Sequence, residues 1–418
     1  MSNLLTTAID VEGYLQNNSE LHSLFPFGVK LSISELSLGY VNKLFVIEAQ
    51  NRQNLSYVLK QTLPYMRHIG SNWPLDTTRF NVELHCLLYY GEILPNFSPK
   101  IYYYDNNRQI MIMEYLKGYV GLGEHLDSYL LLPNLAENIS TFLSSALFFT
   151  SDYYLTSDAK KRLQSKLANP SIETISENLV FTNPYMDFLG NQWNPSLTHH
   201  VVQIRSDSRI KKEVATLKDK FVNSPQTLLH GDFHQDSILS NSKDIKVIDP
   251  EFALWGPAGY DVGLIFCTLI LTYLCLLGKH KEKTIQVMEY QKFLLDTICE
   301  IWHGFSGKFI NLWISNNNGH LIPNSYWEFP EGAKAFAEYR NKYMLQILKD
   351  ACGFAGCRIL AGLMGFITFR NISSINNEDL RSEIEMTAFR IGERLILEHN
   401  HIRNVNGLIA IIQSEANF

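Results

Sequence analysis

The sequence predicts an α+β protein with two lobes, a small N-terminal lobe built on an antiparallel sheet and a larger, mainly helical C-terminal lobe. Short runs rich in β-branched and aromatic residues dominate the chain up to about Leu116, and longer helical patterns dominate after it. The length of 418 residues is enough for two or three domains with cores of their own. We therefore expect one lobe over 1–116 and a second over 117–418.

Turn residues separate the predicted strands of the first lobe, as expected of an antiparallel sheet. The predicted strands cover 29–36, 43–49, 55–60, 101–104 and 109–114, and a helix over 79–92 interrupts them. The predicted helices of the second lobe cover 134–155, 210–222, 262–278, 284–305, 330–354 and 376–399. A strand–turn–strand insert is expected around 228–251. Ligands favour the cleft between two such lobes.

Composition and charge exclude several classes of protein. A net charge of −6 argues against nucleic-acid binding, and 46% hydrophobic residues argue against disorder. The six cysteines form no Cys-x-x-Cys pair and lie mostly in apolar runs, which indicates reduced, buried thiols in a cytoplasmic protein. The N-terminus has no signal-peptide pattern. The uncharged stretch Val262–Gly278 is shorter than the ~20 residues of a membrane span, so we expect a buried core helix and no membrane partner.

The densest polar cluster of the chain lies between two apolar strands. Asp232 follows the first strand and Asp249 the second, and the 249 − 232 = 17 positions from one to the other suffice for a hairpin that brings the carboxylates together. Phosphoryl transfer needs one carboxylate to orient and deprotonate the attacking hydroxyl and another to hold Mg²⁺. Pro250 fixes the backbone between Asp249 and Glu251, so both acids can face one cation.

Two other interpretations of this cluster stay open. Asp232 and Asp249 could be turn residues that only cap their strands. Alternatively, His230, Asp232 and His234 could form a metal site, because alternate residues of a strand share one face. No second group of His, Asp or Glu completes such a hydrolytic site, and we expect His230 to brace the loop.

Several features of the first lobe fit a nucleotide site. Gly39 lies in a hairpin turn that could close over phosphates, although an ordinary turn has the same pattern. Lys60 lies on an apolar strand and could pair with phosphates, with Glu83 of the next helix as its partner; solvated side chains are the alternative. The backbone of Glu114–Leu116 could bind an adenine edge, or form a plain linker.

The order of these pieces resembles the S-methyl-5-thioribose kinases, within the aminoglycoside and choline phosphotransferase branch of the protein-kinase-like superfamily. The resemblance extends from about Leu38 to His399. The segments that carry it are Lys60–Arg67, Trp73–Leu75, Arg79, Glu83, Ser151–Tyr153, Val180–Tyr185, His230–Ile238, Val247–Gly263 and Gly353–Cys357.

The resemblance implies a bilobal protein-kinase-like fold and a cytoplasmic homodimer that acts on a small sugar. The implied reaction transfers the γ-phosphoryl group of ATP to the 1-hydroxyl of S-methyl-5-thio-D-ribose in methionine salvage. Asp232 would activate that hydroxyl, and Asp249 and Glu251 would hold Mg²⁺. The residues implied for the nucleotide and its metal are Gly39, Asn42, Lys60, Glu83, Glu114, Tyr115, Leu116, Asp249, Pro250 and Glu251.

The chain departs from the family pattern at two places. Ala361 and Gly362 stand where the family usually carries two arginines, and Asp236 stands where it usually has a glycine. Arg358 lies three and four residues before Ala361 and Gly362, so on a helix it shares their face. It is predicted to bring a guanidinium to the substrate, unless it is a surface arginine. Two alternatives therefore stay open, another hydroxylated substrate such as choline or an aminoglycoside, and a kinase-like binding protein without catalysis.

Overall fold

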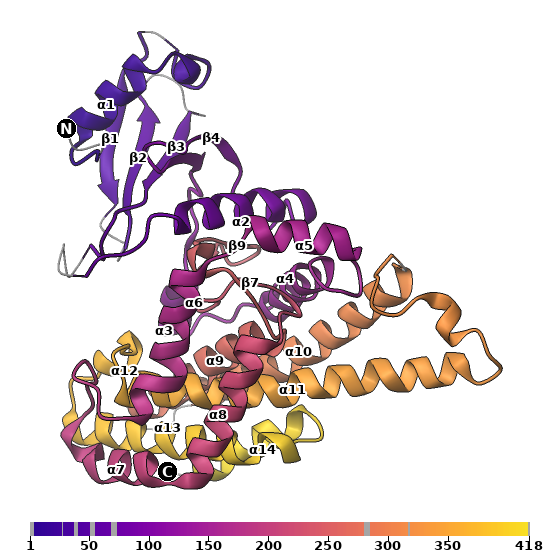
Figure 1. Ribbon diagram of the computed structural model, residues 1–418. Coiled ribbons are helices and arrows are strands. Elements are labelled where there is room, and N and C mark those ends of the chain that lie inside the picture. Colours follow the sequence, from indigo (N-terminus) through magenta and orange to yellow (C-terminus); the bar gives the residue numbers. More distant parts are fainter. Residues whose placement is uncertain are drawn as a thin grey trace. The chain divides into compact units, whose positions relative to one another are not determined.

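The chain folds into two compact units in the computed structural model, which describes residues 4–26, 28–36, 41–50, 55–67, 73–279, 285–316 and 318–416. Unit 1 comprises Met1–Tyr119 together with Lys246–Glu251, and unit 2 comprises Val120–Ile245 and Phe252–Phe418 (Figure 1). The segment Lys246–Glu251 is therefore a short return of the chain to unit 1. The sequence showed only a single change of pattern near Leu116 and did not predict this return.

Unit 1 is built on a five-stranded antiparallel sheet. Its strands are β1 (Leu31–Leu36), β2 (Lys43–Ala49), β3 (Ser56–Gln61), β4 (Ile101–Asp105) and β5 (Ile110–Glu114). The strand order is β1-β2-β3-β5-β4, and every neighbouring pair is antiparallel. All five predicted strands are confirmed within two residues at either end. The central strands β2, β3 and β5 are largely buried, whereas the edge strands β1 and β4 alternate between half-buried and exposed residues.

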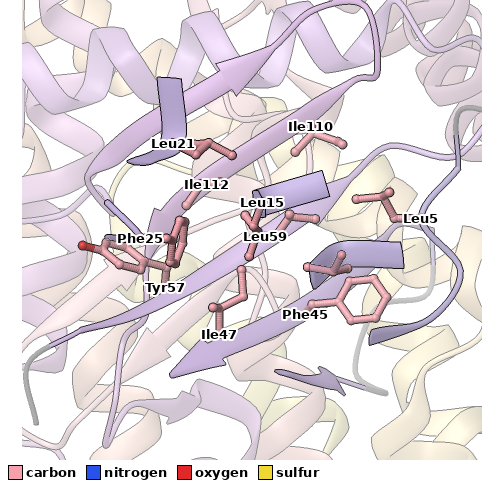
Figure 2. Close-up of a cluster of buried hydrophobic side chains, with 11 residues drawn as sticks. Leu5, Leu15, Leu21, Phe25, Phe45, Ile47, Tyr57, Leu59, Ile110 and Ile112 are labelled. Atoms are coloured by element: carbon pink, nitrogen blue, oxygen red, sulfur yellow. The ribbon is translucent and has the colours of Figure 1, made fainter. Parts of the chain in front are cut away.

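One face of this sheet is covered by the N-terminal segment, α1 (Ala8–Asn17) and the turn η1 (Ser19–Ser23). Figure 2 shows the buried cluster that results, in which Leu15 and Leu21 meet side chains from β2, β3 and β5. The sequence analysis missed α1, although Thr7 and Asp10 form a capping box at its start. The strand residues in the cluster are Phe45, Ile47, Tyr57, Leu59, Ile110 and Ile112.

The opposite face of the sheet packs against α2 (Arg79–Ile93), the helix predicted at 79–92. Val46, Val58 and Met111 point to this face and pack against Phe80 and Leu84 of the helix. Successive residues of a strand point to opposite faces, so Lys60, two residues after Val58, must also point toward α2.

Unit 2 is mainly helical, which completes the predicted α+β class. Its helices are α3 (Leu122–Asp127), α4 (Leu135–Phe149), α5 (Ser157–Lys166), α6 (Pro170–Glu177), α7 (Thr198–Ser206), α8 (Ser208–Asn223), α9 (Gly259–Lys279), α10 (Ile285–Ser315), α11 (Gly332–Met364), α12 (Arg370–Ser373), α13 (Glu378–Glu398) and α14 (Val405–Glu415). Helix α9 packs against α10 and α11, α11 packs against α13, and α4 packs against α10 (Figure 1).

Helix α9 contains the uncharged stretch Val262–Gly278, which the sequence predicts to be a core helix, and this prediction is confirmed. By length and composition alone Gly259–Leu276 could cross a membrane, but the whole stretch is buried inside the protein. Gly259 and Gly263 let it approach α11 closely, since a Cβ on Gly263 would lie 2.6 Å from the Ala351 carbonyl oxygen. Among the described residues all six cysteines are free, and five of them are buried.

Four predictions for unit 2 need correction. The helix predicted over 134–155 ends at Phe149, because the Thr150 hydroxyl bonds back to the Ala146 carbonyl and accepts the Leu228 amide instead. The helices predicted to end at 305 and 354 continue to Ser315 and Met364. The insert predicted around 228–251 is not one simple hairpin. It contains three short strands, and two of them pair with strands that lie outside the insert in the sequence. The strands involved are β6 (Val120–Gly121), β7 (Thr227–Leu229), β8 (Ile238–Ser240), β9 (Ile245–Val247) and β10 (Leu254–Gly256), with β7 paired to β10 and β8 to β6.

Candidate active site

Lys60 and Glu83 form a buried ion pair in unit 1. The Lys60 Nζ atom lies 2.5 Å from Glu83 Oε1, and the two residues are 4% and 1% exposed. The pair forms because Lys60 points to the face of β3 that α2 covers, and Glu83 lies on the buried side of α2. The alternative of two solvated side chains is therefore wrong.

Asp249 joins this pair from the loop that follows β9. Its Oδ1 accepts a hydrogen bond from Lys60 Nζ. Its backbone has φ +64°, a left-handed conformation that costs a non-glycine residue on the order of 1 kcal/mol. Pro250 then begins a short 3₁₀ turn, η6 (Pro250–Phe252). Strain of this kind persists only where surrounding contacts hold it, and here it aims the carboxylate at Lys60.

Glu251 is the second acid of that loop and is 2% exposed. Its Oε2 accepts hydrogen bonds from Asn42 Nδ2 at 3.0 Å and from Arg79 Nε at 2.9 Å. Asn42 is also buried, so its carboxamide belongs to the same polar network and not to an exposed turn. Unit 1 thus brings together five of the residues predicted from the sequence for the nucleotide and metal, Asn42, Lys60, Glu83, Asp249 and Glu251.

The charges of this cluster fit a divalent cation. Glu83, Asp249 and Glu251 are the one set of three acidic, His or Cys residues, among those the structure describes, whose candidate ligand atoms all lie within 4.8 Å of one another. Three carboxylates face two cations, Lys60 and Arg79, which leaves 2 − 3 = −1 when all are ionised. Burial raises the pKa of Glu83 to about 8, with the neighbouring carboxylates adding to the rise, and burial also raises the pKa of Glu251.

The Lys60 ammonium and an oxygen of Glu83 also indicate an excess of negative charge in this cluster. Burial lowers the pKa of the Lys60 ammonium, but the attraction of Asp249, Glu83 and Glu251 outweighs burial and holds that pKa above its ordinary value. Glu83 Oε2 is buried and has no hydrogen-bond partner in the part of the chain that the structure describes. An unpaired buried carboxylate oxygen beside two more carboxylates is an environment that a hard cation with oxygen ligands would relieve.

The segment Glu114–Leu116 follows β5 at the end of the sheet. Leu116 is 9% exposed, and its carbonyl accepts the Tyr119 amide at 3.1 Å. The Tyr115 carbonyl is also occupied, by the Lys117 amide at 2.8 Å. The predicted binding of an adenine edge by this backbone segment stays a prediction.

In unit 2 the loop His230–Asp232 follows β7 and is held by Asp261 of α9. The two carboxylate oxygens of Asp261 accept the amides of His230 at 2.7 Å and Gly231 at 3.1 Å. Burial raises the pKa of Asp261 to about 7. Gly231 has φ +81°, and a Cβ there would lie 2.0 Å from the Phe252 carbonyl oxygen, so only glycine fits.

The Asp232 carboxylate is held in its ionised form. Burial would raise its pKa, but His234, whose Nε2 lies 3.1 Å from Asp232 Oδ2, lowers it together with Arg358 and His230 to about 2. Asp232 in turn affects His234. Burial lowers the pKa of the His234 imidazole, but the attraction of Asp232 outweighs burial and raises this pKa above its ordinary value. Ser237 Oγ donates to the Asp232 carbonyl at 2.7 Å and completes the loop.

Arg358 lies on α11 close enough to Asp232 to influence its charge. Its guanidinium lies over the Phe369 ring, 5.5 Å from the ring centroid, and its Nη1 is buried with no partner among the described residues. The Phe369 ring occupies the space beside Gly362, where a Cβ would come within 2.0 Å of a ring carbon. Arg358 is therefore not a plain surface arginine.

A model of the phosphotransferase enzyme family matches residues 32–273, more than half of the chain. The chain belongs to this family. The matched residues include both the ion pair of Lys60 and Glu83 in unit 1 and the loop that carries Asp232 in unit 2.

Curated relatives of this phosphotransferase extend the match to almost its whole length. It is 30% identical to a methylthioribose kinase of Yersinia pseudotuberculosis over 92% of this chain and 90% of the relative. It is 32% identical to a methylthioribose kinase of Geobacillus kaustophilus over 90% of this chain and 89% of the relative. A solved choline kinase from Cryptosporidium parvum is 14% identical and has a TM-score of 0.45 over 97% of this chain and 100% of its own.

These findings confirm the predicted resemblance and the kinase-like α+β fold, and they identify the phosphotransferase as an enzyme, a small-molecule kinase. Kinases of this family use ATP as the phosphoryl donor. The alternative of a binding protein without catalysis loses its basis, because the relatives that match nine-tenths of the chain are kinases by name.

Of the other predictions from the sequence, one is wrong and two stay untested. The alternative metal site of His230, Asp232 and His234 does not form among the described residues, because Gly231 turns the chain out of strand geometry after β7 and His234 bonds Asp232 directly. Asp249 and Asp232 belong to different units, so the predicted approach of their carboxylates stays a prediction. Gly39 lies outside the described residues.

Three site residues were missed or undervalued by the sequence analysis. Arg79 and Asp261 are fully buried at the first turns of apolar helices, and a charged residue in such a place needs a partner. That signal could have found both. Phe369 carries no comparable signal, since only the fold places its ring on Gly362.

Proposed function

We propose that this kinase transfers the γ-phosphoryl group of ATP to the 1-hydroxyl of S-methyl-5-thio-D-ribose, a step of methionine salvage. The observation that carries the proposal is the buried charge cluster around Lys60 in a chain 30–32% identical to methylthioribose kinases. Phosphoryl transfer is catalysed chiefly by positioned charges, and this cluster supplies them without any covalent intermediate.

Asp232 acts on the sugar in this proposal. Its carboxylate is ionised at neutral pH, because His234, Arg358 and His230 lower its pKa to about 2. It would therefore orient the 1-hydroxyl and take its proton as the new O–P bond forms and the bond from the γ-phosphorus to ADP breaks. Arg358 would donate to a second oxygen of the sugar, since its buried Nη1 has no acceptor among the described residues.

The residues of unit 1 would bind the nucleotide. Lys60 would pair with phosphate oxygens, and the backbone of Glu114–Leu116 would bind the adenine edge. The family resemblance also implies Asn42 and Gly39 for the nucleotide. Glu83 would hold Lys60, and Pro250 would hold the loop. Asp249 and Glu251 would bind Mg²⁺, which neutralises charge on the transferring phosphates when bound.

The same proposal covers the biological setting. We assign nucleotide binding to the first lobe, 1–116, and catalysis to 117–418, with Lys246–Glu251 bringing the metal-binding acids back to unit 1. The partner is a small sugar, and neither nucleic acid nor a membrane is needed. The homodimer is proposed from the family resemblance. A cytoplasmic location agrees with the six free cysteines among the described residues.

A substrate panel tests this function. ADP release is measured with ATP, Mg²⁺ and methylthioribose, choline or an aminoglycoside, and the product is identified by phosphorus NMR. We expect turnover with methylthioribose and a phosphate at carbon 1. Turnover only with another hydroxylated compound would keep the kinase and replace the substrate.

A matched pair of variants tests the role of Asp232. Asp232→Asn should lower kcat by about 10³-fold or more while nucleotide affinity stays within a few fold, because the variant keeps the shape and loses the proton acceptor. Asp236→Asn is the control, since Asp236 is an exposed acid in the same loop. A near-normal kcat in Asp232→Asn would remove Asp232 from the mechanism.

A further inference from the structure

Among the described residues, Arg79 has the largest side chain that is completely enclosed, with 1% exposure. It lies at the first position of α2, and its guanidinium reaches four different segments of unit 1. Nη1 donates to the Asp76 carbonyl at 2.8 Å, and Nη2 donates to the Leu63 carbonyl at 2.7 Å. The remaining bonds go to Asn42 and Glu251, which the proposed function places at the nucleotide and its metal.

Arg79, Asn42 and Glu251 form a closed triangle of hydrogen bonds. Arg79 Nη2 donates to Asn42 Oδ1 at 3.1 Å, Asn42 Nδ2 donates to Glu251 Oε2 at 3.0 Å, and Arg79 Nε donates to the same oxygen at 2.9 Å. Each member is bonded to both others, and all three are at most 3% exposed. The Glu251 carboxylate therefore cannot rotate without breaking two buried bonds, one of them to a charged donor.

The other two bonds of Arg79 fix the elements that carry the rest of the cluster. Leu63 lies two residues after the end of β3, the strand that carries Lys60, and Asp76 lies just before α2, which carries Glu83. A planar guanidinium with five donors in a fixed fork can serve these acceptors at once. A lysine has one nitrogen and cannot span them.

We propose that Arg79 is the positioning residue of the metal-binding loop, and that with Asn42 it locks the Glu251 carboxylate in the orientation that holds the divalent cation of the nucleotide. The inference rests on the proposed function only in that Glu251 binds the cation. The inference goes beyond that function because it assigns the orientation of the Glu251 carboxylate to Arg79. Arg79 therefore acts through Glu251 and contacts neither substrate.

The experiment measures Mn²⁺ affinity in the presence of a non-hydrolysable ATP analogue, by electron paramagnetic resonance of free Mn²⁺, so no turnover is needed. We expect Arg79→Met to weaken Mn²⁺ affinity about tenfold or more, as substitutions of residues that orient metal ligands commonly do. Glu251→Gln should weaken it at least as much. The double variant should lose little beyond Glu251→Gln alone, because Arg79 acts only through that carboxylate.

Two milder variants keep the test decisive where Arg79→Met fails to fold. Arg79→Lys keeps the charge but not the fork, and Asn42→Ala removes one of the two donors to Glu251 Oε2. Both should bind Mn²⁺ more weakly than the wild type by at least about threefold, a loss of roughly 0.7 kcal/mol expected for one hydrogen bond. The control is Lys220→Met in unit 2, which breaks the ion pair of 2.5 Å with buried Asp350 and lowers stability without touching the cluster.

Wild-type Mn²⁺ affinity in folded Arg79→Lys and Asn42→Ala would overturn the inference, and so would full additivity of Arg79→Met with Glu251→Gln. A loss of affinity in Lys220→Met equal to that in Arg79→Lys would also overturn it, because general destabilisation would then explain both. Failure of the wild type to phosphorylate methylthioribose would overturn the proposed function alone, since the Mn²⁺ measurement does not use the sugar.

Discussion

Gly231 offers the sharpest test of how the loop of Asp232 is held. A left-handed φ of +81° costs an alanine about 1 kcal/mol. The added Cβ would also lie 2.0 Å from the Phe252 carbonyl oxygen, whereas ordinary contacts begin at 3.4 Å, so the loop must move by about 3.4 − 2.0 = 1.4 Å. Overpacking of this kind costs about 1–3 kcal/mol more, which gives a total of about 2–4 kcal/mol for Gly231→Ala.

The same movement predicts a loss of activity. Asp232 is the next residue, and a displacement of about 1 Å at a reacting group can cost about 100-fold in kcat. The control is Gly28→Ala, because Gly28 has nearly the same φ of +82° but open space where its Cβ would be. It should lose only about 1 kcal/mol and keep its kcat.

Denaturant unfolding followed by circular dichroism and steady-state kinetics measure both effects. If Gly231→Ala is no less stable than Gly28→Ala and keeps its kcat within about threefold, the contact with Phe252 does not hold the catalytic loop and the reasoning fails.

Three further outcomes are expected. His234→Gln should lose more stability at pH 6 than at pH 9, because the pKa of His234 is raised in the folded state. Such a histidine stabilises the fold below its unfolded-state pKa, and this stabilisation is lost as the pH rises through its folded-state pKa. Equal losses of unfolding free energy at both pH values, measured by denaturation, would contradict the pairing of His234 with Asp232. Gly362→Ala should displace the Phe369 ring from Arg358. The KM for the sugar should then rise about 3–10-fold, the value of one hydrogen bond, while the KM for ATP stays unchanged. Equal rises in both KM values would contradict a role of Arg358 at the sugar. At most Cys299 should react with a thiol reagent in the native protein and all six cysteines in denaturant, because the other five are buried; two fast native thiols would refute this.

Much of the cluster around Lys60 follows from sequence patterns. Alternation within 55–60 predicts a strand and the helical pattern over 79–92 predicts the next element, so Lys60 and Glu83 are natural partners on facing elements. Asp232, Asp249 and Glu251 follow short apolar strands, so the local pattern identifies them as acids at strand ends.

The sequence alone therefore determined the α+β class, the strands, the main helices and the identity of the acids, because hydrophobic periodicity and turn chemistry are local properties of the chain. Only the tertiary structure decided that Lys246–Glu251 belongs with unit 1, that Arg79 bonds Glu251 across 172 positions, and that Phe369 covers Gly362. These are contacts between residues far apart in sequence. Such contacts depend on how whole elements pack, and no local pattern encodes which buried arginine meets which carboxylate.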